Sequence, residues 1–162
     1  MYPLDDETVV LNFLLGVGFD HRKRRIEDIW SFTDHQLEVT HDYIQWIFPL
    51  MEPSSVVANA PVITFPVVQK IRASDSAQIS LVKSTERMLK FYSQNNHWIT
   101  ETDHNHLRIT RILKSLNLLT EQGHAANFYK KIESFISADC GAISSASRSY
   151  WSFALVKLSV PD

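Results

Sequence analysis

Apolar residues recur every three or four positions along most of the chain, and this spacing constrains the fold most strongly. The clearest stripe, on residues 75–94, consists of Leu81, Val82, Thr85, Met88, Leu89 and Tyr92. A period of 3.6 residues places such side chains on one face of an amphipathic helix. Further helices are predicted at about residues 5–15, 25–32, 34–48, 66–72, 103–119, 125–138 and 142–158. The sequence therefore predicts an all-α fold of about seven or eight helices.

Residues 49–66 interrupt the helical pattern. Four of the six prolines fall here, at positions 49, 53, 61 and 66, and proline cannot donate the backbone hydrogen bond of an inner helical turn. The same segment contains Val56, Val57, Ala58, Val62, Ile63 and Phe65. We therefore expect a long loop packed against the helices, and a single compact domain covering residues 1–162.

Composition and charge exclude several classes of protein. The formal charge of -2 gives no general attraction to nucleic acid or anionic membranes, which argues against a nucleic-acid partner. Cys140 is the single cysteine, as is typical of proteins from reducing compartments. The first residues lack the basic start of a secretory signal, and the apolar run at 9–19 is too short to cross a bilayer. We expect a soluble, cytoplasmic protein without a membrane span.

The predicted helix at 37–48 carries polar residues although most of its surface is expected to be buried. Apolar side chains, Tyr43 and Trp46 among them, cover more than half of its circumference when residues are placed about 100° apart. Such a helix must be buried almost all round. The remaining strip holds Glu38, Asp42 and Gln45, with His41 at its edge.

The predicted helix at 104–119 also carries polar residues on or beside the stripe that is expected to be buried. Its core stripe consists of Ile109, Ile112, Leu113, Leu116 and Leu119. Asn105 falls on that stripe, and Arg108 and His106 fall at its two borders. Because an unpaired buried polar group costs roughly 1 to 3 kcal/mol, these residues need partners. The simplest solution is an ion pair between the guanidinium of Arg108 and the carboxylate of Asp42 or Glu38. This polar set either fixes the packing of the two helices or lines a ligand pocket with Trp46 or Tyr43 as its aromatic wall.

Two other constellations suggest alternative functions. The basic run at residues 21–25 is either a phosphate or nucleic-acid site or a solvated loop. His41 beside Asp42 or Glu38 is suited to acid and base catalysis, but no nucleophile has an obvious activating partner, so an enzyme is the alternative and not the main prediction. The spacing of the seven histidines matches no metal motif, and we expect no metal or cofactor.

Two motifs carry a resemblance to a known family. The run Tyr-Ile-Gln-Trp-Ile-Phe-Pro at 43–49 and the run Leu-Arg-Ile-Thr-Arg-Ile-Leu at 107–113 resemble the opioid growth factor receptor conserved region. The similarity covers about residues 19–157. It implies an all-helical domain whose animal members are described as receptors for the opioid peptide Met-enkephalin. It also implies association with the nucleus and its envelope, and an action on cell proliferation.

We therefore predict a stand-alone helical domain that binds a small peptide or small molecule, with a protein partner also open. The predicted site residues are Glu38, His41, Asp42, Tyr43, Gln45, Trp46, Asn105 and Arg108. Asp42 is expected to neutralise Arg108 or a ligand amine, and Arg108 a ligand carboxylate. Gln45 and Asn105 are expected to orient amides of the ligand, and Trp46 to supply an apolar wall. Ligand identity and oligomeric state stay open.

Overall fold

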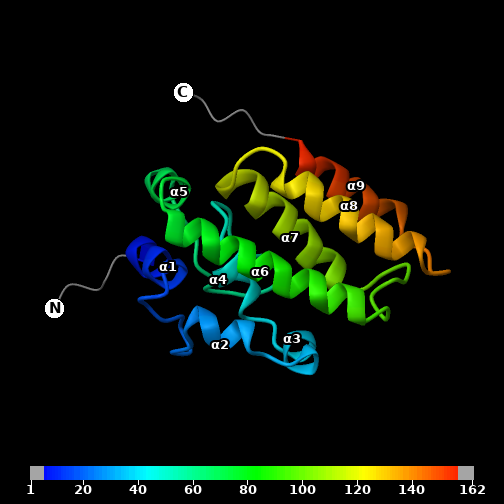
Figure 1. The fold of residues 1–162 in the computed structure, drawn as a ribbon, viewed down its shortest axis with the longest axis horizontal. Helices are drawn as coiled ribbons and strands as arrows, with labels where there is room; N and C mark the ends of the chain where they lie inside the picture. The colour runs from blue at the N-terminus through cyan, green and yellow to red at the C-terminus, as the bar shows by residue number, and fades with distance from the viewer. Residues whose placement is uncertain (1–5, 157–162) are drawn as a thin grey trace. The chain divides into compact units, whose positions relative to one another are not determined.

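The computed structural model describes residues 6–156 of the chain. These residues form nine helices, which are α1 (Asp6–Leu14), α2 (Ile26–Trp30), α3 (Asp34–Val39), α4 (Ile44–Ile47), α5 (Phe65–Arg72), α6 (Asp75–Gln94), α7 (His104–Leu119), α8 (His124–Ser137) and α9 (Ser145–Leu155). The only strand-like pairing in the described part is an isolated bridge between Leu50 and Val62. The all-α prediction is confirmed (Figure 1). None of these helices has the length and apolar character needed to span a membrane.

The chain divides into two compact units. Unit 1 is Met1–Arg87 and unit 2 is Met88–Asp162, so the boundary falls inside α6. Each unit has its own set of packed helices. The expectation of one domain over residues 1–162 stays a prediction.

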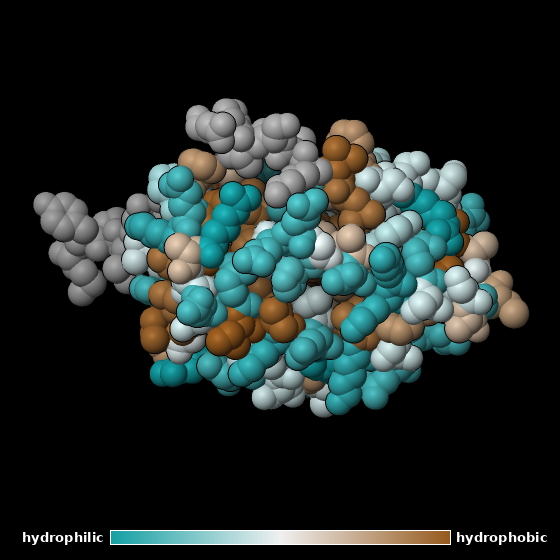
Figure 2. All heavy atoms as spheres, turned by 45° about the horizontal axis from the view of Figure 1, so that its top comes forward, coloured by the Kyte–Doolittle hydropathy of each residue, from teal (hydrophilic) through white to brown (hydrophobic). Residues whose placement is uncertain are grey.

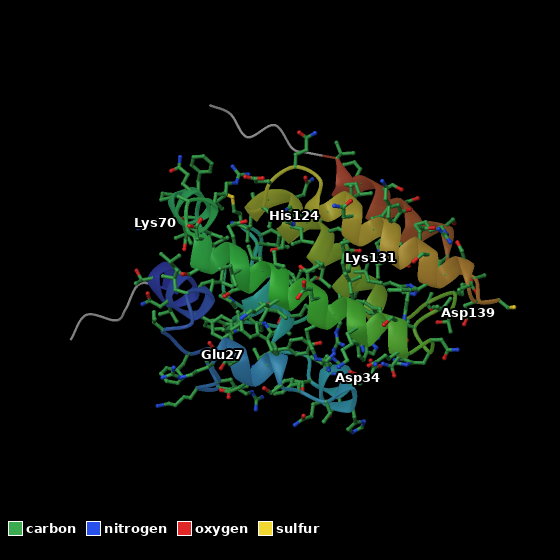
Figure 3. The ribbon with its side chains drawn as sticks, in the orientation of Figure 1. Glu27, Asp34, Lys70, His124, Lys131 and Asp139 are labelled. Carbon is green, nitrogen blue, oxygen red and sulfur yellow. The ribbon has the colours of Figure 1, made fainter. Side chains whose placement is uncertain are left out.

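The core of unit 1 forms where α1 packs against α4 and α5. Phe13 of α1 meets Trp46 of α4 edge to face, with ring centroids 5.4 Å apart, a favoured geometry for aromatic pairs. The start of α3 is anchored by Asp34, labelled in Figure 3, whose carboxylate lies 2.8 Å from an Nη2 atom of Arg87. This ion pair ties α3 to the part of α6 that belongs to unit 1.

The proline-rich segment packs at its ends and is exposed in its middle. Leu50 and Ile63 are buried, and the Ile63 amide donates a hydrogen bond to the Leu50 carbonyl at 3.0 Å. Val56, by contrast, is 62% exposed. The segment therefore closes over the core where its two ends meet.

In unit 2, α7 packs against both α8 and α9 (Figure 1). The buried face of α7 carries the predicted stripe of Ile109, Ile112, Leu113, Leu116 and Leu119. Asp103 caps this helix by accepting a hydrogen bond from the amide of Asn105 at 2.8 Å, as N-terminal carboxylates commonly do. Trp151 is the large buried residue of α9.

The predicted continuous helix at 34–48 is wrong. Helix α3 ends at Val39, Thr40 is extended with φ -93° and ψ 127°, and α4 begins only at Ile44. A β-branched residue has modest helix propensity, so tertiary contacts decide its conformation. Here the break places His41 and Asp42 in a loop, and that loop forms one wall of the candidate site.

In the view of Figure 2, hydrophobic and hydrophilic residues are interspersed over the face shown. Single exposed apolar side chains are normal for globular proteins.

Candidate functional site

The loop between α1 and α2 is organised around Asp20. Its buried carboxylate accepts hydrogen bonds from the backbone amides of Arg22 and Arg24, at 2.8 and 2.9 Å, and from Nε of Arg24 at 2.6 Å. Lys23 between them has a positive φ of 60°, which is uncommon for a residue with a side chain. Asp20 thus folds the basic run into a tight turn that orients its arginines.

This turn meets the loop between α3 and α4 at the carboxylate of Asp42. Nη2 of Arg24 lies 3.0 Å from Oδ1, while Nε of Arg22 and Nε2 of His21 lie 2.5 and 3.3 Å from Oδ2. We call His21, Arg22, Arg24 and Asp42 the Asp42 cluster. The His21 ring also stacks on Trp46, with centroids 5.8 Å apart and an interplanar angle of 15°.

The cluster controls the ionisation of Asp42. Burial by itself raises the pKa of this carboxyl, but the hydrogen bonds and charges of Arg24 and Arg22 outweigh burial and hold the pKa below its usual value. Asp42 is therefore a fixed negative charge near neutral pH. A carboxylate of this kind is suited to binding a cation and is a poor proton donor.

A hollow of about 460 Å³ opens beside the cluster in unit 1. It is lined by Arg22, Arg24, Val39, Thr40, His41 and Asp42. The lining combines both signs of charge with hydroxyl, imidazole and aliphatic groups, so it is suited to a ligand of mixed polarity.

The hollow brings together two features that sequence reasoning had kept apart. His41 and Asp42 were predicted site residues, whereas Arg22 and Arg24 belonged to the alternative phosphate site. Two cations of that basic run are paired with carboxylates. The signal for this pairing was Asp20, which stands directly before the run and has the type of side chain that caps backbone amides in turns.

The other predicted residues of unit 1 have supporting positions. Tyr43 is fully buried, and its hydroxyl donates to the Leu37 carbonyl at 3.1 Å. Gln45 is also buried and donates from Nε2 to the His41 carbonyl at 3.2 Å, while its Oε1 atom has no hydrogen-bond partner in the described structure. Glu38 is half-buried on α3. The hydrogen bonds of Tyr43 and Gln45 support the loop that carries His41 and Asp42.

Asn105 and Arg108 lie in unit 2, and both are buried on α7. The amide nitrogen of Asn105 donates to Asp103 at 2.9 Å, and its amide oxygen accepts from Nη1 of Arg108 at 3.2 Å. These bonds link Asn105 to Asp103 and Arg108 within unit 2. The expected role of Asn105 in orienting amides of a ligand stays a prediction. The expected pairing of Asp42 with Arg108 involves one residue from each unit and stays a prediction.

Sequence reasoning missed a hydrogen-bonded hub around His106 in unit 2. Its Nε2 atom lies 2.8 Å from the Trp98 carbonyl, and its Nδ1 atom lies 2.9 Å from the Ser147 hydroxyl. Because a carbonyl only accepts, Nε2 carries the proton and, in a neutral ring, Nδ1 accepts from Ser147. The position of His106 at the border of the α7 stripe was the available signal.

Comparison with known proteins places the chain in a family. A family model described as the opioid growth factor receptor (OGFr) conserved region matches residues 17–159. The human opioid growth factor receptor is 39% identical over a match covering 58% of this chain and 17% of the human protein. Mouse opioid growth factor receptor-like protein 1 is 31% identical, over 56% of this chain and 23% of the mouse protein.

The chain thus spans less than a quarter of the length of these relatives. No solved structure matches it. The match of the family model covers most of the 162 residues, including both motifs and the whole Asp42 cluster. The chain belongs to the opioid growth factor receptor conserved-region family.

Proposed function

We propose that this chain binds a small peptide or small molecule in the hollow beside Asp42. The observation that carries the proposal is a carboxylate contacted by two arginines beside a hollow of about 460 Å³. Ligand pockets in proteins commonly measure roughly 300 to 1,000 Å³ and contain a few well-placed polar groups. The hollow has that size, and its lining is mostly polar, with Val39 as the aliphatic residue among Arg22, Arg24, Thr40, His41 and Asp42.

The family supports a peptide as the ligand. The relatives are named opioid growth factor receptors, and the resemblance implies Met-enkephalin as their ligand. Because the chain spans under a quarter of their length, a receptor function here is an inference from the shared domain. A location inside the cell, in the cytoplasm or the nucleus, belongs to the same proposal.

The chemistry of the lining assigns a role to each contact. Asp42 binds the ligand's cationic group, and His41 supplies a hydrogen-bonding imidazole at the rim. Val39 is 54% exposed and offers apolar contact. For Asn105 and Arg108 of unit 2, a role in binding stays a prediction.

A titration of the isotope-labelled protein with Met-enkephalin, followed by backbone amide chemical shifts, tests this proposal. We expect saturable shifts at residues 21–24 and 39–42. Asp42→Asn should weaken binding at least about tenfold, since it removes the charged partner of the ligand. Asp75→Asn is the matched control, because Asp75 is an exposed carboxylate at the start of α6. Shifts confined to other residues, or equal affinity for the two variants, would contradict the proposal.

A further inference from the structure

The two arginines of the Asp42 cluster are held very differently. Arg24 has a side chain only 15% exposed, bonded through Nε to the buried carboxylate of Asp20 and through Nη2 to Asp42. Its guanidinium also lies over the Phe32 ring, 5.9 Å from the centroid. Arg24 thus contacts three residues, Asp20, Asp42 and Phe32, and is a fixed part of the fold.

Arg22 is loosely held. Its side chain is 67% exposed, and it contacts Asp42 through Nε, at 2.5 Å from Oδ2. Its two terminal nitrogens have no hydrogen-bond partner among the described residues. An ion pair with so exposed a partner contributes little to stability, because water screens it and the long side chain loses freedom in forming it. Another cation can therefore replace Arg22 on Asp42 at small cost.

We propose that Arg22 occupies the position of a ligand ammonium on Asp42, and that the natural ligand is a zwitterion with a free amine and a free carboxylate. This inference rests on the proposed function of the hollow. The ligand amine replaces Arg22 at Oδ2 of Asp42, while Arg24 stays on Oδ1. The released guanidinium of Arg22 then binds the ligand carboxylate.

Charge balance favours a zwitterion over a simple cation. A cation that displaces Arg22 leaves a guanidinium without its carboxylate, whereas a zwitterion brings a replacement anion with it. Arg22 is suited to this second contact because its terminal nitrogens form a planar fork that matches a carboxylate. Both partners of the exchange, Arg22 and Asp42, line the hollow.

One peptide in four forms tests this exchange: Met-enkephalin with free ends, with its amine acetylated, with its carboxyl amidated, and with both ends blocked. Affinities are measured by calorimetry for the natural chain and for Arg22→Gln. In the natural chain, blocking either end should weaken binding about tenfold, as expected for loss of a charged contact. The amidated form should bind Arg22→Gln about threefold more tightly than it binds the natural chain. In the variant, the Arg22 guanidinium no longer competes with the ligand amine for Asp42.

The acid and amide forms should then differ by less than about twofold in Arg22→Gln, because the carboxylate has lost its partner. Lys23→Gln is the matched control. It removes the same charge from the adjacent residue, which does not line the hollow, and it should leave the ranking of the four peptides unchanged. Circular dichroism of each variant confirms that it is folded.

The outcomes separate the two proposals. Equal weakening of all four forms by Arg22→Gln overturns the exchange and leaves ligand binding in the hollow intact. If blocking either end leaves the affinity of the natural chain unchanged, the exchange is overturned, and so is the proposed contact between Asp42 and the ligand amine. If none of the four forms binds the natural chain at millimolar concentration, both proposals fail.

Discussion

At the scale of single residues, Asp42 links two loops through its charge, which predicts a pH-dependent stability. Asp42→Asn should lower the free energy of unfolding by about 1 to 2 kcal/mol near neutral pH, because Arg22 and Arg24 lose a charged acceptor. The folded-state pKa lies below the unfolded value of about 3.9. The contribution is therefore complete above that value and is lost as the pH falls through the folded pKa.

Urea unfolding of the natural chain and Asp42→Asn at a series of pH values measures this effect. The difference between the two proteins should shrink below about pH 4. Asp75→Asn, on an exposed carboxylate, should show no comparable difference at any pH. A difference for Asp42→Asn that stays constant down to the acid limit of folding would contradict the assignment of the lowered pKa.

The same residues show which parts of the site were predictable. His41 and Asp42 were identified because polar groups inside an apolar run need a reason to be there. The partners of Asp42, which are Arg22 and Arg24, lie about twenty residues earlier in the chain, and no local spacing specifies that contact. Charge runs are usually solvated, so sequence reasoning gave the basic run a separate role.

At the scale of elements, the packing of the α8–α9 connection depends on Gly141. A Cβ atom at this position would lie 2.2 Å from the Ile99 carbonyl oxygen, far inside van der Waals contact. Gly141→Ala should therefore lower the free energy of unfolding by about 1 to 3 kcal/mol, as overpacking against backbone commonly does.

Thermal and urea unfolding of Gly141→Ala check this prediction. Gly123→Asn is the control. Gly123 has a φ of 106°, a conformation that residues with side chains rarely adopt, but a Cβ atom added there would have no other atom within 4 Å. This variant therefore reports backbone strain without a steric clash, and asparagine keeps that strain small. If Gly141→Ala left the free energy of unfolding unchanged, the close approach to Ile99 would not be a real constraint.

The His106 hub joins α7 to α9, and a double-mutant cycle measures that link. The Nδ1 atom of His106 lies 2.9 Å from the Ser147 hydroxyl. His106→Ala, Ser147→Ala and the double variant should give a coupling free energy of about 0.5 to 1.5 kcal/mol, the usual contribution of a hydrogen bond. Ser145→Ala, on the exposed neighbour at the start of α9, should not couple to His106. Strictly additive effects of His106 and Ser147 would contradict the bond.

Helix prediction succeeded where a stripe had one buried face and failed where burial was nearly complete. For α6 and α7 the periodicity defined the helices almost to the residue. Between Leu37 and Phe48, apolar residues on every side fitted a buried helix and a folded-back loop equally well. The break at Thr40 follows from tertiary contacts of Asp42 and from the Tyr43 hydroxyl bonding to Leu37, and neither is visible in a periodic pattern.

At the scale of the whole molecule, the position of the unit boundary predicts how the chain unfolds. The boundary falls within α6, between Arg87 and Met88, so one continuous helix contributes residues to both units. Helix formation is cooperative, because each turn depends on the hydrogen bonds of its neighbours. We therefore expect the two units to unfold in a single transition, as the length of an ordinary domain suggests.

Native-state hydrogen exchange at increasing urea, read by mass spectrometry, measures this cooperativity. The slowest amides of α1 and α5 in unit 1 and of α7 and α8 in unit 2 should report the same free energy of unfolding, with the same dependence on urea. Glu86→Pro, in the middle of α6, should lower both values together, because proline interrupts the shared helix at a cost of about 3 kcal/mol. If one unit kept its protection while the other lost it, residues 1–162 would form two domains joined by a helix, and the hollow beside Asp42 would belong to a unit that folds alone.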